Sequence, residues 1–214
     1  KLLLEVAESR RRARPKFVRA DQMFGTQKSV EQATDEQISQ WKARRFQSRA
    51  NVVDIGCGMG GDLLGLSAIV PTVGIERDQA LAHFAATNAE RLGLTAEIRA
   101  IDAETLDVSD FDAWHCDPDR RPSGVRFSNI EQSFPSHVAL DRWRFQNSNG
   151  AIKLAPAAVV PRAWLFGERE WIGSRGECRQ QVIWFGILAN RATMHTATVV
   201  DVGQEGESFS GEPD

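Results

Sequence analysis

The sequence predicts an α/β fold with a doubly wound, mostly parallel sheet of seven strands, preceded by helices and closed by an antiparallel hairpin. Two observations support this prediction. Between residues 51 and 154, short apolar runs alternate with helical segments, a pattern typical of parallel strands joined by right-handed crossovers. The apolar runs 170–173 and 180–185 then flank Ser-Arg-Gly-Glu, a turn sequence typical of a β-hairpin.

Composition limits the class of protein. The chain has 214 residues, of which 42% are hydrophobic, enough for one sizeable core. No run of about 18 apolar residues occurs, so we expect no membrane span, and the first residues do not form a secretory signal. Cys57, Cys116 and Cys178 contain no C-x-x-C pair, which favours a reducing, cytoplasmic location. The four histidines lack the spacing of metal ligands, so we expect no metal.

Residues 1–48 are predicted to form a helical segment before the core. An amphipathic helix covers 1–14 and ends at Pro15, and a second helix covers 35–46 with Thr34 as its N-cap. This region has more lysine and arginine than acidic residues, although the whole chain carries a net charge of −3. The local excess of positive charge fits either a surface that faces nucleic acid or ordinary solvated helix faces.

Residues 49–201 are predicted to form the core, and residues 202–214 an acidic, flexible tail rich in glycine, glutamate and serine. The expected strands are 51–55, 72–76, 96–101, 111–116, 150–154, the two hairpin strands and 191–201. The expected helices of the core are 62–67, 78–92 and 136–145. The oligomeric state stays open.

A glycine cluster, Asp54-Ile-Gly-Cys-Gly-Met-Gly-Gly-Asp62, lies between the first predicted strand and the following helix. Glycines allow the backbone to turn tightly and leave room for a ligand, and the helix N-terminus offers N–H groups to an anion. Gly56, Gly58 and Gly61 also satisfy the dinucleotide pattern G-x-G-x-x-G. The glycines alone therefore do not identify the ligand.

Three acidic residues favour one ligand over the others. Asp54 precedes the first glycine by two positions, where its carboxylate can meet a cation, whereas NAD sites usually have an apolar residue there. Glu76 ends the second strand and is placed to accept both ribose hydroxyls. Asp102 follows the third strand, where it can bind an adenine amine. We interpret the site as one for S-adenosylmethionine, with NAD and a nucleotide sugar as alternatives.

The fourth strand leads into Asp117-Pro118-Asp-Arg-Arg121, which resembles the (Asn/Asp/Ser)-Pro-Pro-aromatic motif of amino-directed class I methyltransferases. The resemblance implies that Asp117 takes an N–H of the acceptor nitrogen and that Pro118 stiffens the loop. No aromatic residue follows Pro118. Cys116 suggests covalent attack on a pyrimidine, but a buried structural thiol is the better interpretation.

The two arginines that follow have two interpretations. Arg120 and Arg121 would clamp a phosphate of the substrate. Alternatively, they form an ion pair with Asp117, Asp119 or Glu170 that holds the loop.

Residues 29–186, most of the chain, resemble bacterial class I S-adenosylmethionine-dependent methyltransferases of the THUMP-like domain group, which are related to the RNA cap guanine-N2 (trimethylguanosine synthase-like) enzymes. The resemblance implies a Rossmann-like fold, and contact of Gln32 and Thr34 with the methionine end of the donor. The matching segments are 29–36, 54–62, 117–121, 152–156 and 170–173.

We therefore predict a methyltransferase acting on a nucleobase nitrogen of RNA, similar to guanine N2. The alternatives are a small-molecule methyltransferase with a closed apolar pocket and a non-catalytic donor-binding partner subunit. The RNA hypothesis predicts an open cleft flanked by Arg11, Arg12, Arg120 and Arg121. The predicted donor ligands are Gln32, Thr34, Asp54, Gly56, Gly58, Gly60, Asp62, Glu76, Arg77, Asp102 and Ala103.

Overall fold

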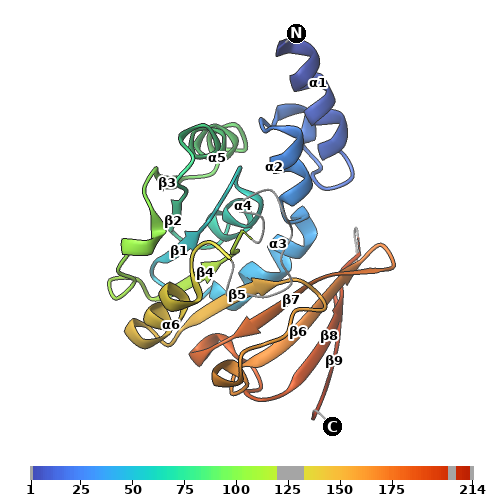
Figure 1. The fold of residues 1–214 in the computed structure, drawn as a ribbon. Helices are drawn as coiled ribbons and strands as arrows, with labels where there is room; N and C mark the ends of the chain where they lie inside the picture. Colours follow the sequence, from blue (N-terminus) through green and yellow to red (C-terminus); the bar gives the residue numbers. More distant parts are fainter. Residues whose placement is uncertain (1, 120–132, 202–205, 213–214) are drawn as a thin grey trace. The chain divides into compact units, whose positions relative to one another are not determined.

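The computed structural model describes residues 2–119, 133–201 and 206–212 (Figure 1). The chain divides into two compact units, Lys1–Ala103 and Glu104–Asp214. Among the described residues, three strands belong to the first unit and six to the second, and only the strand at 207–211 is additional to the eight ranges expected from the sequence. No helix in the described ranges is both long and apolar enough to span a bilayer.

The strands of the first unit form parallel pairs in the order β3-β2-β1, as predicted from the alternation of strands and helices. Their bounds, with those of the two crossover helices, are β1 (Val52–Ile55), α4 (Gly61–Ser67), β2 (Thr72–Ile75), α5 (Gln79–Arg91) and β3 (Ala96–Arg99). All four residues of β1 are buried; three are apolar, as expected for a strand covered on both faces, and the fourth is Asp54. Helix α5 begins after Asp78, whose carboxylate accepts hydrogen bonds from the N–H groups of Ala80 and Leu81.

Three helices precede β1, one more than predicted. They are α1 (Leu2–Ala13), α2 (Gln27–Gln32) and α3 (Glu36–Ala43), with 3₁₀ turns η1 (Ala20–Gln22) and η2 (Arg44–Phe46). The additional helix is α2, whose six residues are too few to show helical periodicity. Its sequence signal is a reciprocal capping box between Thr26 and Ser29.

The helices before β1 pack on α4 and α5 through a cluster of buried apolar side chains. The cluster contains Ala13, Phe17, Ala20, Met23, Val30, Met59, Leu64 and Ala89. Asn88 of α5 is fully buried, and its side chain forms three hydrogen bonds. It accepts from the Phe24 N–H and donates to the carbonyl oxygens of Phe24 and Met59, the last at 2.9 Å. Because Met59 lies in the glycine cluster, Asn88 joins that loop to the N-terminal segment.

A buried ion pair joins α3 to the start of α4. Lys42 Nζ lies 2.5 Å from Asp62 Oδ1, and these side chains are only 2% and 7% exposed. The Thr34 hydroxyl donates to Asp62 Oδ2 at 2.7 Å. The prediction that Thr34 caps α3 is therefore wrong: the N-cap residue is Asp35, because the hydroxyl of Thr34 binds the distant carboxylate of Asp62 instead of a nearby N–H.

The second unit has the strand order β4-β5-β7-β6-β8-β9, with both parallel and antiparallel pairs. Its elements are η3 (Ala103–Thr105), which begins at the unit boundary, β4 (Ala113–Cys116), α6 (His137–Gln146), β5 (Gly150–Leu154), η5 (Arg162–Trp164), β6 (Glu168–Ser174), β7 (Glu177–Trp184), η6 (Gly186–Leu188), β8 (His195–Val199) and β9 (Glu207–Gly211). Strands β4 and β5 are parallel, whereas β7 is antiparallel to both of its neighbours, β5 and β6.

The predicted hairpin is confirmed by β6 and β7, which are longer than expected. Its two turn residues, Arg175 and Gly176, have φ angles of 53° and 74°. Positive φ at both central residues is the geometry that matches the twist of antiparallel strands. Glycine adopts a positive φ without strain, whereas Arg175, which has a Cβ atom, is sterically strained there.

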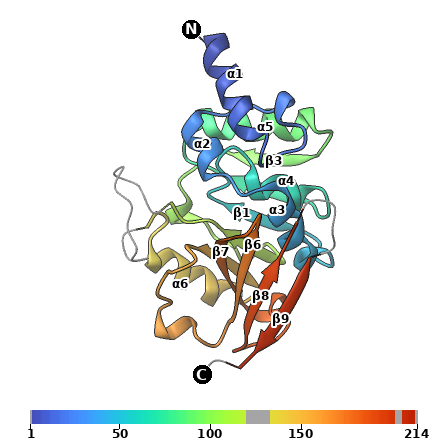
Figure 2. The same cartoon turned by 90° about the vertical axis from the view of Figure 1, so that its right-hand side faces the viewer.

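The C-terminal residues differ from the prediction of a flexible tail, because 207–211 form β9, antiparallel to β8 (Figure 2). Hydroxyl pairs reinforce the backbone pairing: Thr196 Oγ1 lies 3.0 Å from Ser210 Oγ, and Thr198 Oγ1 lies 2.8 Å from Ser208 Oγ. Serine-rich composition indicated disorder, but serine and threonine pairs across strands stabilise a sheet.

The Lys42–Asp62 pair generates a prediction about stability. In Lys42→Met, the buried carboxylate of Asp62 loses its cation, so we expect the free energy of unfolding to fall by about 3–5 kcal/mol. Urea unfolding followed by circular dichroism measures this change.

The matched control is Arg99→Met. Arg99 pairs with Glu97 at 2.7 Å, but their side chains are 43% and 60% exposed. Because solvent screens such a pair, we expect the control to lose less than about 1 kcal/mol. Equal losses in both variants would contradict a structural role for the buried pair.

Candidate functional site

The glycine loop between β1 and α4 depends on left-handed backbone conformations. Gly56, Gly58 and Gly60 have φ angles of 77°, 56° and 104°, which L side chains rarely adopt. A Cβ atom added to Gly58 would meet no atom within 4 Å, so the space beside this residue is open. In contrast, a Cβ on Gly61 would lie 2.7 Å from the backbone N of Thr34. The loop is thus open at Gly58 and closely packed at Gly61.

Glu76, the residue after β2, holds its carboxylate against this loop. Its Oε2 accepts a hydrogen bond from the Gly58 N–H at 3.0 Å, and its Oε1 accepts one from the Asp78 N–H at 2.9 Å. Both bonds orient the carboxylate but leave it further acceptor capacity, since an ionised carboxylate has about four lone-pair directions. Glu76 can therefore also accept hydroxyl groups of a ligand.

Negative charge gathers around the loop. Asp54, in β1, is only 1% exposed. The pKa of the Cys57 thiol, in the loop itself, is raised well above its usual value by burial and further by the carboxylates of Asp54 and Glu76. Burial disfavours any ion, but the two carboxylates add negative potential, which favours a cation over an anion. The loop thus suits a positively charged ligand better than an anionic one.

The remaining predicted donor ligands of the first unit have different environments. Asp102 follows β3 and is exposed, and because β1, β2 and β3 are parallel it lies at the same edge of these strands as Glu76. Arg77 is exposed, whereas Ala103 is buried and begins η3. Gln32 is the last residue of α2 and is exposed. Their contacts with a ligand stay predictions.

Two of the predicted donor ligands have structural partners. Both carboxylate oxygens of Asp62 face other side chains, Oδ1 the ammonium of Lys42 and Oδ2 the hydroxyl of Thr34. These contacts hold Thr34 against the glycine loop, where Gly61 has room for no side chain. Thr34 and Asp62 therefore support the loop whether or not they also touch a ligand.

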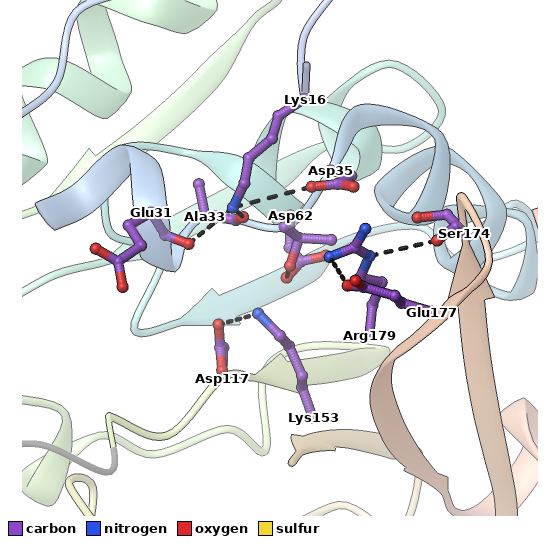
Figure 3. Close-up of polar contacts among 11 residues, drawn as sticks. Lys16, Glu31, Ala33, Asp35, Asp62, Asp117, Lys153, Ser174, Glu177 and Arg179 are labelled. Carbon is purple, nitrogen blue, oxygen red and sulfur yellow. Dashed lines mark hydrogen bonds and ion pairs between the residues drawn. The ribbon is translucent and has the colours of Figure 1, made fainter. Parts of the chain in front are cut away.

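Lys16 also supports this region and was missed in the sequence. Its Nζ donates to the carbonyl oxygens of Glu31 and Ala33, both at 2.7 Å, and lies 3.9 Å from Asp35 (Figure 3). Carbonyls at a helix C-terminus carry partial negative charge, so a lysine there stabilises the end of α2 and the segment that contains Thr34. Lys16 lies far from these partners in sequence, so no local pattern indicates the contact.

In the second unit, Asp117 follows β4 and forms an ion pair with Lys153 of β5 (Figure 3). Lys153 Nζ lies 2.5 Å from Asp117 Oδ2, and the side chains are 13% and 32% exposed. Pro118, the next residue, is buried. Arg120 and Arg121 lie outside the described residues. Lys153 was not among the predicted site residues.

Strand register is the signal that would have identified Lys153. Cys116, the last residue of β4, pairs with Ile152 of β5 in parallel register, so Asp117 and Lys153 occupy the next position on both strands. Neighbouring strands lie about 4.8 Å apart, which is within reach of a lysine and an aspartate on one face. Their contact follows once β4 and β5 are recognised as neighbours.

Other residues that the sequence singled out have partners in their own units. Glu170 is fully buried and accepts hydrogen bonds from Trp184 Nε1 and Thr198 Oγ1, at 2.7 and 2.6 Å. Arg11 and Arg12 on α1 both bind Glu8, and their hydrogen bonds lower the pKa of that carboxyl to about 2. Both arginines remain exposed, as a nucleic-acid surface requires. In the described parts of the chain, no group of three His, Cys, Asp or Glu side chains could hold a metal ion.

Comparison with known proteins finds relatives that are named methyltransferases. No protein-family model matches the chain. Two proteins of Mycobacterium tuberculosis, from strains CDC 1551 and H37Rv, are each 30% identical to it over 215 aligned residues, and both are named uncharacterized S-adenosylmethionine-dependent methyltransferases. The alignment covers 95% of this chain but 59% of each relative. The chain thus spans less than two thirds of the curated relatives it matches.

Solved structures show the same fold. A putative methyltransferase from Porphyromonas gingivalis W83 superposes with a TM-score of 0.70 at 19% identity, covering 95% of this chain and 55% of that chain. The methyltransferase subunit of a type I restriction-modification system from Streptococcus thermophilus has a TM-score of 0.51 at 15% identity, covering 83% of this chain and 47% of that chain. This chain therefore has the Rossmann-like α/β fold of class I methyltransferases, with a mostly parallel sheet and antiparallel strands near its C-terminal end.

Proposed function

We propose that this chain is a methyltransferase that uses S-adenosylmethionine and methylates a nitrogen of a nucleobase in RNA, similar to guanine N2. The observation that carries the proposal is the open glycine loop at Gly58, with the carboxylates of Asp54 and Glu76 beside it. The similarity to named methyltransferases over 95% of the chain supports the same reaction.

The residues of the loop fit this donor. S-adenosylmethionine supplies a methyl group on a positively charged sulfur, and the S–C bonding pair stays on sulfur when the methyl group leaves. The open space at Gly58 allows a ligand to approach the backbone closely. Asp54 and Glu76 favour a cation there, and Glu76 has acceptor capacity for ribose hydroxyls. A dinucleotide, whose pyrophosphate is anionic, fits this potential poorly.

Asp117 and Pro118 would serve the acceptor. Asp117 accepts an N–H of the acceptor nitrogen and thereby aims the nitrogen lone pair, while the buried Pro118 limits movement of the loop. The nitrogen forms its new N–C bond with this lone pair and then releases one proton, which the Asp117 carboxylate takes and passes to water. Positioning supplies most of the catalysis, because the methyl group is already activated.

The RNA substrate rests on the resemblance to the cap guanine-N2 enzymes and on the excess of positive charge in residues 1–45. Arg11 and Arg12 on α1 are paired with Glu8, but their side chains stay exposed, so a phosphate could compete with Glu8 for them. A small-molecule acceptor and a non-catalytic subunit are the competing functions, and they give different results in the experiments below.

The first experiment measures donor binding. In Glu76→Gln, one charged acceptor of the loop becomes a neutral amide, so we expect S-adenosylmethionine to bind about 10-fold more weakly or worse in calorimetry. We expect NAD to bind the unaltered protein more weakly than S-adenosylmethionine.

Glu97→Gln is the matched control, because Glu97 lies on β3 with its side chain 60% exposed. We expect it to bind the donor as the unaltered protein does. Thermal unfolding of both variants separates loss of the fold from loss of the ligand contact. Stronger binding of NAD, or unchanged donor affinity in a folded Glu76→Gln, would refute the donor site.

The second experiment measures methyl transfer. Donor labelled in the methyl group is incubated with pools of RNA, protein and small molecules. We expect label in RNA, and we expect Asp117→Ala to reduce it about 100-fold while donor affinity is unchanged, because Asp117 aims the acceptor and not the donor.

The control is Asp110→Ala, a substitution at an exposed aspartate. We expect this variant to transfer labelled methyl groups as fast as the unaltered protein does. If only the small-molecule pool is labelled, RNA is not the substrate and the acceptor is a small molecule. No label in any pool, with donor still bound, would establish the non-catalytic function instead.

A further inference from the structure

The Asp117–Lys153 pair has a feature that the proposed function does not use. Oδ2 of Asp117 lies 2.5 Å from Nζ of Lys153, and the side chains are 32% and 13% exposed. An ionised carboxylate only accepts hydrogen bonds, and an ammonium only donates them, with three N–H groups. A carboxylate that would bind the acceptor nitrogen is therefore adjacent to a fixed donor.

Resting on the proposed function, we infer that Lys153 is a positioning residue for the acceptor. We also infer that the Asp117–Lys153 pair recognises an amine N–H that lies beside a hydrogen-bond acceptor. The substrate class is then an exocyclic amine of a heteroaromatic ring, next to a ring nitrogen or carbonyl. Adenine, cytosine and guanine all present such an edge.

The register of the strands places Lys153 next to Asp117. Cys116 pairs with Ile152, so Asp117 and Lys153 are at the next parallel position. On the other side of β5, the residue opposite Lys153 is Val182 of β7, which is apolar. Glu170 lies one strand further, opposite Val182, and its carboxylate accepts hydrogen bonds from other side chains.

The hydrogen-bonding pattern of the pair favours one acceptor class. A carboxylate or phenolate has no hydrogen to donate to Asp117, and a protonated aliphatic amine has no lone pair to accept from Lys153. A neutral amine next to a ring nitrogen or carbonyl satisfies both partners at once, since the amine donates to Asp117 and its neighbour accepts from Lys153.

Lys153 also limits the movement of Asp117. A charge-assisted hydrogen bond to one carboxylate oxygen restricts the rotation of the side chain and presents the second oxygen in one direction. Because Lys153 is mostly buried, water competes poorly with this contact. Loss of Lys153 should therefore weaken acceptor recognition without altering donor binding.

The experiment uses the full chain, methyl-labelled donor and total RNA, which is digested to nucleosides after the reaction. We expect the label on an exocyclic amine of a base. In Lys153→Met, we expect kcat/KM for RNA to fall about 10-fold or more, mainly through a higher KM, with unchanged donor affinity in calorimetry.

Two variants serve as controls. Lys153→Arg keeps a positive charge and N–H donors, so we expect it to retain activity within about 3-fold. Arg162→Met removes an exposed positive charge of η5, outside the proposed RNA-binding residues, and we expect it to behave as the unaltered protein. Rescue by arginine but not by methionine distinguishes positioning from simple packing of the lysine stem.

The possible results separate the two proposals. If RNA is labelled and Asp117→Ala is inactive, but Lys153→Met matches the unaltered protein, the role of Lys153 is refuted and the proposed function stands. Label on an aliphatic amine, a ribose hydroxyl or a ring carbon would refute the proposal that the pair recognises an exocyclic amine beside a hydrogen-bond acceptor. This identification uses the unaltered protein, so it holds even if a variant fails to fold. Absence of label in every pool refutes the proposed function itself.

Discussion

The buried contact of Lys42 with Asp62 is the interaction on which the candidate donor site depends. Asp62 follows the glycine loop directly and starts α4, while Lys42 comes from α3. The same carboxylate also binds Thr34 in the segment between α2 and α3. Two buried charges destabilise a fold strongly unless they remain paired with each other. The loop and the helices before β1 must therefore fold as one unit.

This constraint has an electrostatic consequence for the loop. The carboxylates of Asp54 and Glu76 both raise the pKa of the Cys57 thiol, so both add negative potential at the loop. The hydrogen bond from Gly58 holds Glu76 in place, and a positively charged ligand would be favoured there. The left-handed glycines make this possible, because Gly58 leaves the approach to the backbone open.

Sequence patterns predicted most of the fold, because alternating strands and crossover helices have distinct periodicities. They predicted β1 to β5 and the β6–β7 hairpin, but not α2, which is too short, or β9, whose serines pair with threonines of β8. For the site, acids at strand ends were predictable from topology. Lys16, Lys42 and Lys153 were not, since each contacts residues remote in sequence, and the ligand roles of the predicted residues stay predictions.

The distribution of the three thiols has a practical consequence. Cys57 and Cys116 are buried, and the pKa of Cys57 is raised by burial and by the nearby carboxylates, so neither offers a reactive thiolate to reagents in solution. Cys178, on β7, is exposed. A maleimide dye would attach at that one position in the native protein, and fluorescence could then follow the hairpin without any engineered cysteine.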